Sequence, residues 1–135
     1  MRVTEEDLAL IRIVLELPYL IKVLDTDMKA IEGSSLRTRS ALLLQLERLR
    51  EEAQREIRQM RHVLRLRGIQ IVKQTMLEDR LCAEYICRGH HDRMLLMWSR
   101  IRIDVEEMTT ACLDIKSPGS FGKPAQTAGF PPKQK

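Results

Sequence analysis

Between Ser35 and Arg67, apolar residues recur in steps of three and four and are separated by charged and amide side chains. Such steps place apolar residues along one narrow stripe of an α-helix. The stripe consists of Leu42, Leu46, Leu49, Ala53, Ile57, Met60 and Leu64. Ser34 or Ser35 can cap the start of this helix, and Gly68 can take the left-handed conformation that ends one. The pattern predicts a long helix over residues 35–67.

The narrow stripe is typical of a coiled-coil-like seam rather than of a helix surrounded by a thick core. The heptad repeat is imperfect, because Glu56 stands where a strict repeat requires an apolar residue and Ile57 replaces it. A strict repeat over many heptads would favour an extended supercoil. We therefore expect this helix to pack in an antiparallel hairpin or a small bundle.

The N-terminal segment predicts another long helix, over residues 4–31. Thr4 is followed directly by acidic residues, which is a favourable helix start, and Pro18 either kinks the helix or opens a new one. The apolar residues cover most of the circumference, and such a helix needs cover on more than one side. In a short chain a second subunit is the natural source of that cover, so the segment predicts a homodimer. The predicted contact residues are Ile11, Leu15, Leu20, Trp98 and Ile101.

After Gly68 the chain becomes rich in β-branched and partly alternating residues. Residues 69–76 fit a strand and residues 81–88 a returning strand. The turn between them lacks an Asn-Gly or Asp-Gly pair, so a continuing helix, and with it an all-α bundle, is the alternative. We predict a β-hairpin over residues 69–88, which must lie on a helix or pair across a dimer because a lone hairpin is marginal in water.

A third helix is predicted over residues 92–113, with Asp92 as its cap. Its apolar face consists of Met94, Met97, Trp98, Ile101, Val105, Met108 and Cys112. Residues 116–135 are rich in Pro, Gly, Lys and Gln, which is typical of a disordered basic tail. The sequence thus predicts one mostly helical α+β domain over residues 1–115, with long amphipathic helices packed as a hairpin or bundle and one small β-hairpin.

Composition narrows the setting of the protein. Residues 8–24 form the most apolar stretch, but Arg12, Glu16 and Lys22 interrupt it, which argues against a membrane span. The N-terminus carries acidic residues where a secretory signal has basic ones. An odd number of cysteines without regular spacing indicates reduced thiols. We expect a cytoplasmic protein that does not enter a membrane.

The cysteines and histidines near residue 90 are chemically suitable zinc ligands. They lack a Cys-x-x-Cys pair or a second pair at finger-like distance, and only Cys87 and His91 would align if the segment were a helix. Nucleophilic catalysis by Cys87 would need a base held by a third group, and no family signature for this is present. The chain also has no phosphate loop and no dinucleotide turn. We predict no enzyme and no cofactor, with Cys87 and His91 as the candidates to test for a metal.

Charge is unevenly distributed along the chain. Residues 34–68 carry nine basic and four acidic side chains, whereas the segments on either side are net acidic. Arg55, Arg58, Arg61 and Arg65 recur along one side of the predicted long helix, where guanidinium groups can contact phosphates or guanine edges. Acidic residues on the same helix and the missing aromatic stacking residues argue against nucleic acid, and charge pairing within the fold is the simpler explanation.

Taken together, these patterns predict a non-catalytic protein–protein interaction or regulatory protein, built as a homodimeric helical scaffold. The alternative is a nucleic-acid-binding regulator that uses the arginine-rich helix. A zinc-binding or cysteine-dependent enzyme is the third hypothesis.

Overall fold

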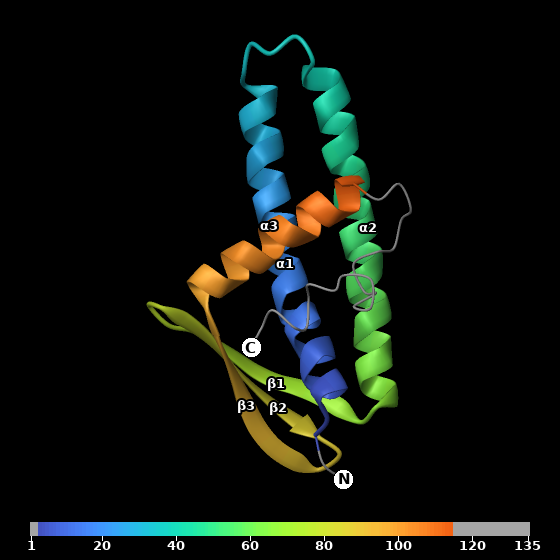
Figure 1. Cartoon of the computed structure of the whole chain (residues 1–135), viewed down its shortest axis with the longest axis vertical. Coiled ribbons are helices and arrows are strands. Elements are labelled where there is room, and N and C mark those ends of the chain that lie inside the picture. The colour runs from blue at the N-terminus through green and yellow to red at the C-terminus, as the bar shows by residue number, and fades with distance from the viewer. Residues whose placement is uncertain (1–2, 115–135) are drawn as a thin grey trace.

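The computed structural model describes residues 3–114 and begins with two long helices (Figure 1). Helix α1 spans Glu5–Glu32 and α2 spans Arg39–Leu66, and the two run side by side as an antiparallel hairpin. The expected α+β class, with long helices packed as a hairpin, is confirmed. No helix within the described residues is both long enough and apolar enough to span a membrane. The predicted tail, residues 116–135, lies outside the described residues.

Side-chain hydrogen bonds cap the two ends of α1, whereas the N-cap residue of α2 makes no side-chain capping hydrogen bond. The Thr4 hydroxyl accepts a hydrogen bond from the Asp7 backbone, and the Asp7 carboxylate accepts one from the Thr4 backbone, so a capping box starts α1. Ser34 or Ser35 was expected to cap the second helix, but neither is its N-cap, and the Ser34 hydroxyl donates to the Ile31 carbonyl at 2.7 Å at the end of α1. Thr38 is the N-cap residue of α2, which therefore starts later than the predicted residue 35.

A three-stranded antiparallel sheet follows, in the order β1-β2-β3. Strands β1 (Ile69–Met76) and β2 (Arg80–Cys87) form the predicted hairpin, which rules out the all-α alternative. Strand β3 (His90–Met97) was not predicted, and α3 (Trp98–Asp114) begins later than the expected residue 92. The β2–β3 turn consists of Arg88 and Gly89, with φ values of 48° and 86°, as a tight two-residue hairpin turn requires.

Trp98 connects the sheet to α3. Its Nε1 donates to the Leu77 carbonyl at 2.8 Å, and its backbone N–H donates to the Asp79 carbonyl at 3.1 Å. The indole ring also meets the ring of Tyr19 edge-on, with centroids 5.5 Å apart. These contacts hold the first residue of α3 against both the β1–β2 turn and α1, and Asp92 has no capping role because it lies within β3.

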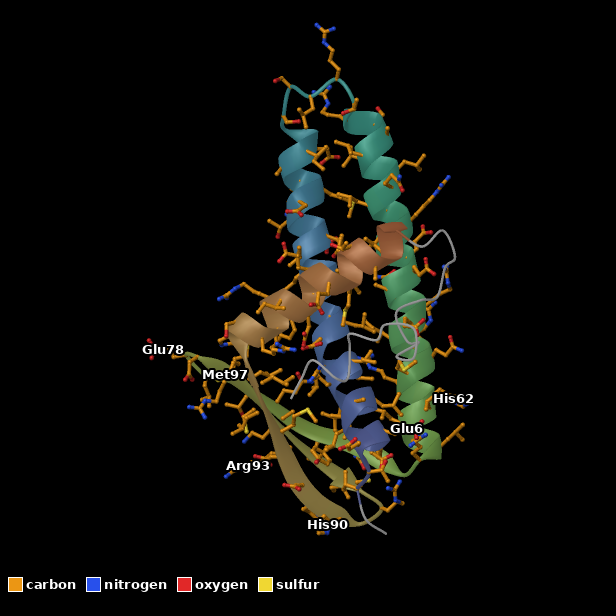
Figure 2. All side chains as sticks on the ribbon, in the orientation of Figure 1. Glu6, His62, Glu78, His90, Arg93 and Met97 are labelled. Atoms are coloured by element: carbon orange, nitrogen blue, oxygen red, sulfur yellow. The ribbon has the colours of Figure 1, made fainter. Side chains whose placement is uncertain are left out.

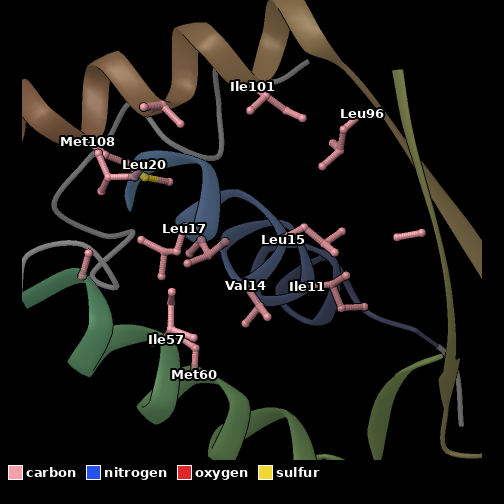
Figure 3. Packing of buried hydrophobic residues seen from close by; sticks show 14 of the residues in the cluster. Ile11, Val14, Leu15, Leu17, Leu20, Ile57, Met60, Leu96, Ile101 and Met108 are labelled. Atoms are coloured by element: carbon pink, nitrogen blue, oxygen red, sulfur yellow. The ribbon is translucent and has the colours of Figure 1, made fainter. Parts of the chain in front are cut away.

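Helix α1 lies at the centre of the core, with α2, the sheet and α3 around it (Figure 3). Its buried apolar residues are Ile11, Ile13, Val14, Leu15, Leu17, Leu20 and Leu24. Because alternate residues of a strand share a face, β2 directs Leu81, Ala83, Tyr85 and Cys87 toward this core. Most of the cover that the apolar circumference of α1 requires is therefore supplied by the same chain.

Candidate functional site

Asp7 joins separate parts of the chain at the start of α1. Nη1 of Arg67 donates to Oδ1 of Asp7 at 2.9 Å, and Nη2 of Arg88 donates to Oδ2 at 2.6 Å. Arg67 is the C-cap residue of α2, and Arg88 belongs to the β2–β3 turn. The fully buried Asp7 carboxylate therefore ties the end of α2 and the end of the sheet to the first turn of α1.

The pKa of Asp7 lies well below its usual range. Burial would raise this pKa, but hydrogen bonds from the Thr4 backbone, Arg88 and Arg67 favour the ionised form and together outweigh burial. The Cys87 thiol is also buried and donates to Oδ2 of Asp7 over 3.9 Å. Because capping and ion pairing occupy this carboxylate, Asp7 is a structural anchor of the fold.

A pair of buried carboxyl groups lies in the contact between α1 and α3. Glu16 and Asp104 are both 0% exposed. Nε of Arg12 is 3.6 Å from Oδ2 of Asp104 and 4.0 Å from Oε2 of Glu16, and Nε of Arg100 is 3.4 Å from Oδ1 of Asp104. Despite these ion-pair distances, no donor in residues 3–114 is placed to hydrogen-bond to the ionised carboxylates.

A proton on the Glu16 carboxyl group supplies a hydrogen-bond donor for this buried pair. The pKa of Glu16 is raised to about 10, mainly by burial and then by the hydrogen bond and charge of Asp104, against the charges of Arg12 and Arg100. The neutral carboxyl group of Glu16 can donate to Asp104, which an ionised one cannot do. At neutral pH the pair therefore holds a proton between its two carboxyl groups.

A groove of about 710 Å³ lies between α1, α2 and β1. Its apolar lining consists of Val14, Pro18, Leu64, Ile69, Ile71 and Ile86. Arg61 and Arg65 line it from α2, and Gln70 and Gln74 line it from β1. Pro18 has no N–H, so the Val14 carbonyl one turn earlier lacks a helical donor on the stretch of α1 that borders the groove. The groove thus combines an apolar floor with cationic and amide groups.

Arg55, Arg58, Arg61 and Arg65 are all exposed on α2. At about 100° per residue, Arg58, Arg61 and Arg65 fall within an arc of about 60° on the groove side, and Arg55 lies about 60° beyond. Within the described residues these arginines form no ion pair, whereas Arg50 of the same helix pairs with Asp25 at 2.6 Å. Charge pairing within the described fold therefore does not account for the arginine row. His62 also lies on the outer side of α2, away from α1 (Figure 2).

Cys87 and His91 do not come together as metal ligands. Their expected alignment required a helix, but the segment is a sheet in which Cys87 faces the core and His91 lies exposed opposite Ile86. His90 lies at the exposed β2–β3 turn (Figure 2). Among residues 3–114, no three His, Cys, Asp or Glu side chains are grouped in a way that could hold a metal ion.

The residues predicted to form a dimer contact lie in the core of one chain. Ile11, Leu15, Leu20 and Ile101 are at most 3% exposed, and Trp98 is half-buried. None of the four buried residues is therefore available as a surface contact in this fold. The homodimer stays a prediction, but it can no longer rest on these side chains.

The sequence patterns missed the buried acidic residues and the groove. A carboxyl group inside an apolar run is an available signal, and Glu16 shows it within residues 8–24. Asp7 and Asp104 carry no such signal, because their arginine partners or their burial depend on contacts between distant elements. The groove likewise requires knowledge of where β1 lies relative to α2.

These features define a small α+β protein in which a helical hairpin and a third helix pack on a three-stranded antiparallel sheet. A family model described as YhjD protein matches residues 2–117, so the chain belongs to the YhjD protein family. Neither a curated protein nor a solved structure matches the chain.

Proposed function

We propose that this chain is a non-catalytic interaction protein that binds an acidic segment of a partner protein in the groove between α2 and β1. The observation that carries the proposal is a row of exposed arginines that form no ion pair within residues 3–114 and lie beside an apolar groove. A surface ion pair alone contributes about 1 kcal/mol or less. Apolar contact in the same groove supplies the further free energy that a specific partner needs.

The chemistry of the groove favours binding over catalysis. Its polar lining consists of guanidinium and amide side chains, Arg61, Arg65, Gln70 and Gln74. Guanidinium groups stay protonated and amides do not titrate, so neither acts as a general acid or base near neutral pH. Both bind carboxylates well, and a guanidinium does so through paired hydrogen bonds.

The proposal includes a cytoplasmic location and leaves room for a homodimer. A cytoplasmic location agrees with the free thiols of Cys82 and Cys87. A homodimer would need contacts other than Leu15 and Leu20, and exposed apolar side chains such as Leu36 and Leu44 in the helical hairpin are among those available.

Nucleic-acid binding is the second candidate, since the same exposed arginines can contact phosphates. The two proposals differ in what Arg55 does. A backbone tracking along α2 would use Arg55 together with Arg58, Arg61 and Arg65, whereas the groove uses Arg61 and Arg65 and leaves Arg55 outside.

Fluorescence anisotropy tests both candidates. The probes are a labelled peptide in which glutamate alternates with valine, a labelled DNA duplex and a labelled single-stranded RNA, each at low and near-physiological salt. The groove variant is Arg61→Ala/Arg65→Ala. The control variant, Arg48→Ala/Arg55→Ala, removes the same charge from exposed positions of α2 outside the groove.

The proposal expects peptide binding that survives near-physiological salt, is lost in the groove variant and is kept in the control. Nucleic-acid binding that survives the same salt and weakens in both variants would favour the second candidate. Absence of peptide binding, or equal loss in the two variants, would overturn the groove proposal.

A further inference from the structure

Strand β1 has a free edge beside the arginine groove. In the order β1-β2-β3, β1 pairs with β2 on one side, and no other strand of residues 3–114 pairs with it. The strand is exposed from Val72 to its end, and residues from Ile69 to Gln74 include several that line the groove. An edge strand presents unpaired backbone N–H and C=O groups, which are a template for another strand.

The groove borders α1 between two of the elements that surround it. Viewed along α1, the surrounding elements are α3, the sheet and α2 (Figure 3). Val14 and Pro18 of α1 line the groove between β1 and α2. A strand added to β1 would extend the sheet into this interval and lie over these two residues, with Arg61 and Arg65 beside it.

We infer that the acidic partner segment binds in an extended conformation as an additional strand on the free edge of β1, with its carboxylates directed at Arg61 and Arg65. This inference rests on the proposed function and specifies how the same groove is used. Main-chain hydrogen bonds to β1 supply part of the affinity, and side chains on alternate positions supply the specificity.

The side-chain pattern of the segment follows from strand geometry. Successive side chains of a strand point to opposite faces, so every second residue faces the helices. Residues on the helical side meet Arg61, Arg65 and the apolar side chains of Val14 and Leu64, so acidic and aliphatic residues are favoured at these positions. Residues on the other side lie next to Lys73, which also favours acidic side chains.

The charges at this edge argue against the other occupants within reach. A second copy paired through β1 would bring Arg61, Arg65 and Lys73 of both chains together, and like charges opposite one another destabilise a sheet. Residues 116–135 of the chain itself contain four lysines and no acidic residue, so they do not match the groove in charge.

Strand β3 serves as an internal comparison, because it forms the other edge of the sheet. It carries Asp92 on the face shared with Met94 and Leu96, and none of the groove residues belongs to it. An acidic strand would meet the like charge of Asp92 on the helical side there, and only Arg93 on the opposite side would attract it. The acidic segment should therefore bind to the edge of β1 and not to the edge of β3.

Amide hydrogen exchange of the full chain, measured residue by residue by NMR, tests the strand. With the alternating glutamate–valine peptide bound, the amides of β1 that point away from β2 should exchange at least about tenfold more slowly. The outward amides of β3 should not change. A peptide of the same composition with its glutamates and valines in two separate blocks should bind at least about tenfold more weakly, because it cannot present carboxylates on alternate positions.

The outcomes separate this inference from the proposed function. If the alternating peptide binds through Arg61 and Arg65 but β1 gains no protection, or if the block peptide binds equally well, the added strand is refuted and the arginine groove stands. If the alternating peptide does not bind at all, both fail.

Discussion

Replacing Glu16 with glutamine is expected to stabilise the protein and to remove part of its pH dependence. Glu16 is fully buried and holds a proton in the folded state, whereas an unperturbed glutamate has a pKa of 4.5. Since the folded-state pKa is the higher one, the stabilising contribution of this proton is complete below about pH 4.5 and is lost as the pH rises toward 10.

The magnitude follows from the distance between neutral pH and the pKa of an unperturbed glutamate. Each pH unit corresponds to about 1.4 kcal/mol, so taking up the proton during folding at pH 7 costs about 3 kcal/mol. An amide has almost the same volume, needs no proton and still presents an N–H donor to Asp104. Glu16→Gln should therefore raise the free energy of unfolding at pH 7 by up to about 3 kcal/mol.

Urea unfolding followed by circular dichroism measures this from about pH 5 to about pH 9. The difference in unfolding free energy between Glu16→Gln and the unchanged protein should grow by about 1.4 kcal/mol per pH unit. Glu51→Gln, an exposed charge removed from α2, is the control and should show no such growth. A difference for Glu16→Gln that stays constant across this range would refute the proton held between Glu16 and Asp104.

Three further substitutions, one of them with a matched control, test the packing of the fold by the same unfolding measurement. Asp7→Ala should cost about 2–3 kcal/mol, because it leaves two guanidiniums without their buried counter-charge. The pKa of Asp7 is lowered in the fold, so the stabilisation from its ionised carboxylate is present above pH 3.8 and is lost below it. As the pH falls through this range, the free energy of unfolding of Asp7→Ala should therefore decrease less than that of the unchanged protein. Gly68→Ala should cost about 1–2 kcal/mol, because φ is +75° and the new Cβ would lie 3.0 Å from Cγ of Arg88, whereas Gly33→Ala, at φ −86°, should be nearly neutral. Leu15→Arg should unfold the chain, since Leu15 is 1% exposed; a folded monomer, seen by light scattering, would instead place Leu15 at a subunit contact.

The sequence predicted the long helices and the first hairpin well because their signals are local. The stripe from Leu42 to Leu64 and the following Gly68 define α2 to within a few residues at each end. The β-branched run after Gly68 predicts β1 in the same way. In each case the period of the apolar residues is visible within the element itself.

The third strand was missed because its apolar residues do not alternate. Met94 and Leu96 face the helices, but Leu95 and Met97 on the other face are apolar as well. A continuous apolar run does not distinguish a strand from the start of a helix, and Asp92 offered a plausible cap. The tight turn at Gly89 was the signal that favoured another strand.

The buried acidic residues depend on contacts that no local pattern contains. Asp7 is paired with Arg67 and Arg88, which lie 60 and 81 residues further along the chain. In the sequence, Asp104 is indistinguishable from the other charged residues of an amphipathic helix. Only the packing of α3 across α1 places its carboxylate next to Glu16. The shifted pKa values of Asp7 and Glu16 therefore follow from how the helices and strands pack, not from the local composition.

The apolar residues around α1 indicate that the helix must be covered on several sides, but they do not indicate which chain supplies the covering elements. The prediction of a second subunit assumed that one chain of this length could not supply enough cover, and α2, the sheet and α3 supply most of it. Between α2 and β1, Val14 and Pro18 line a groove. The feature that suggested a dimer therefore also indicates where a partner would complete the core, and the arginines at that position favour an acidic strand over a second copy of the chain.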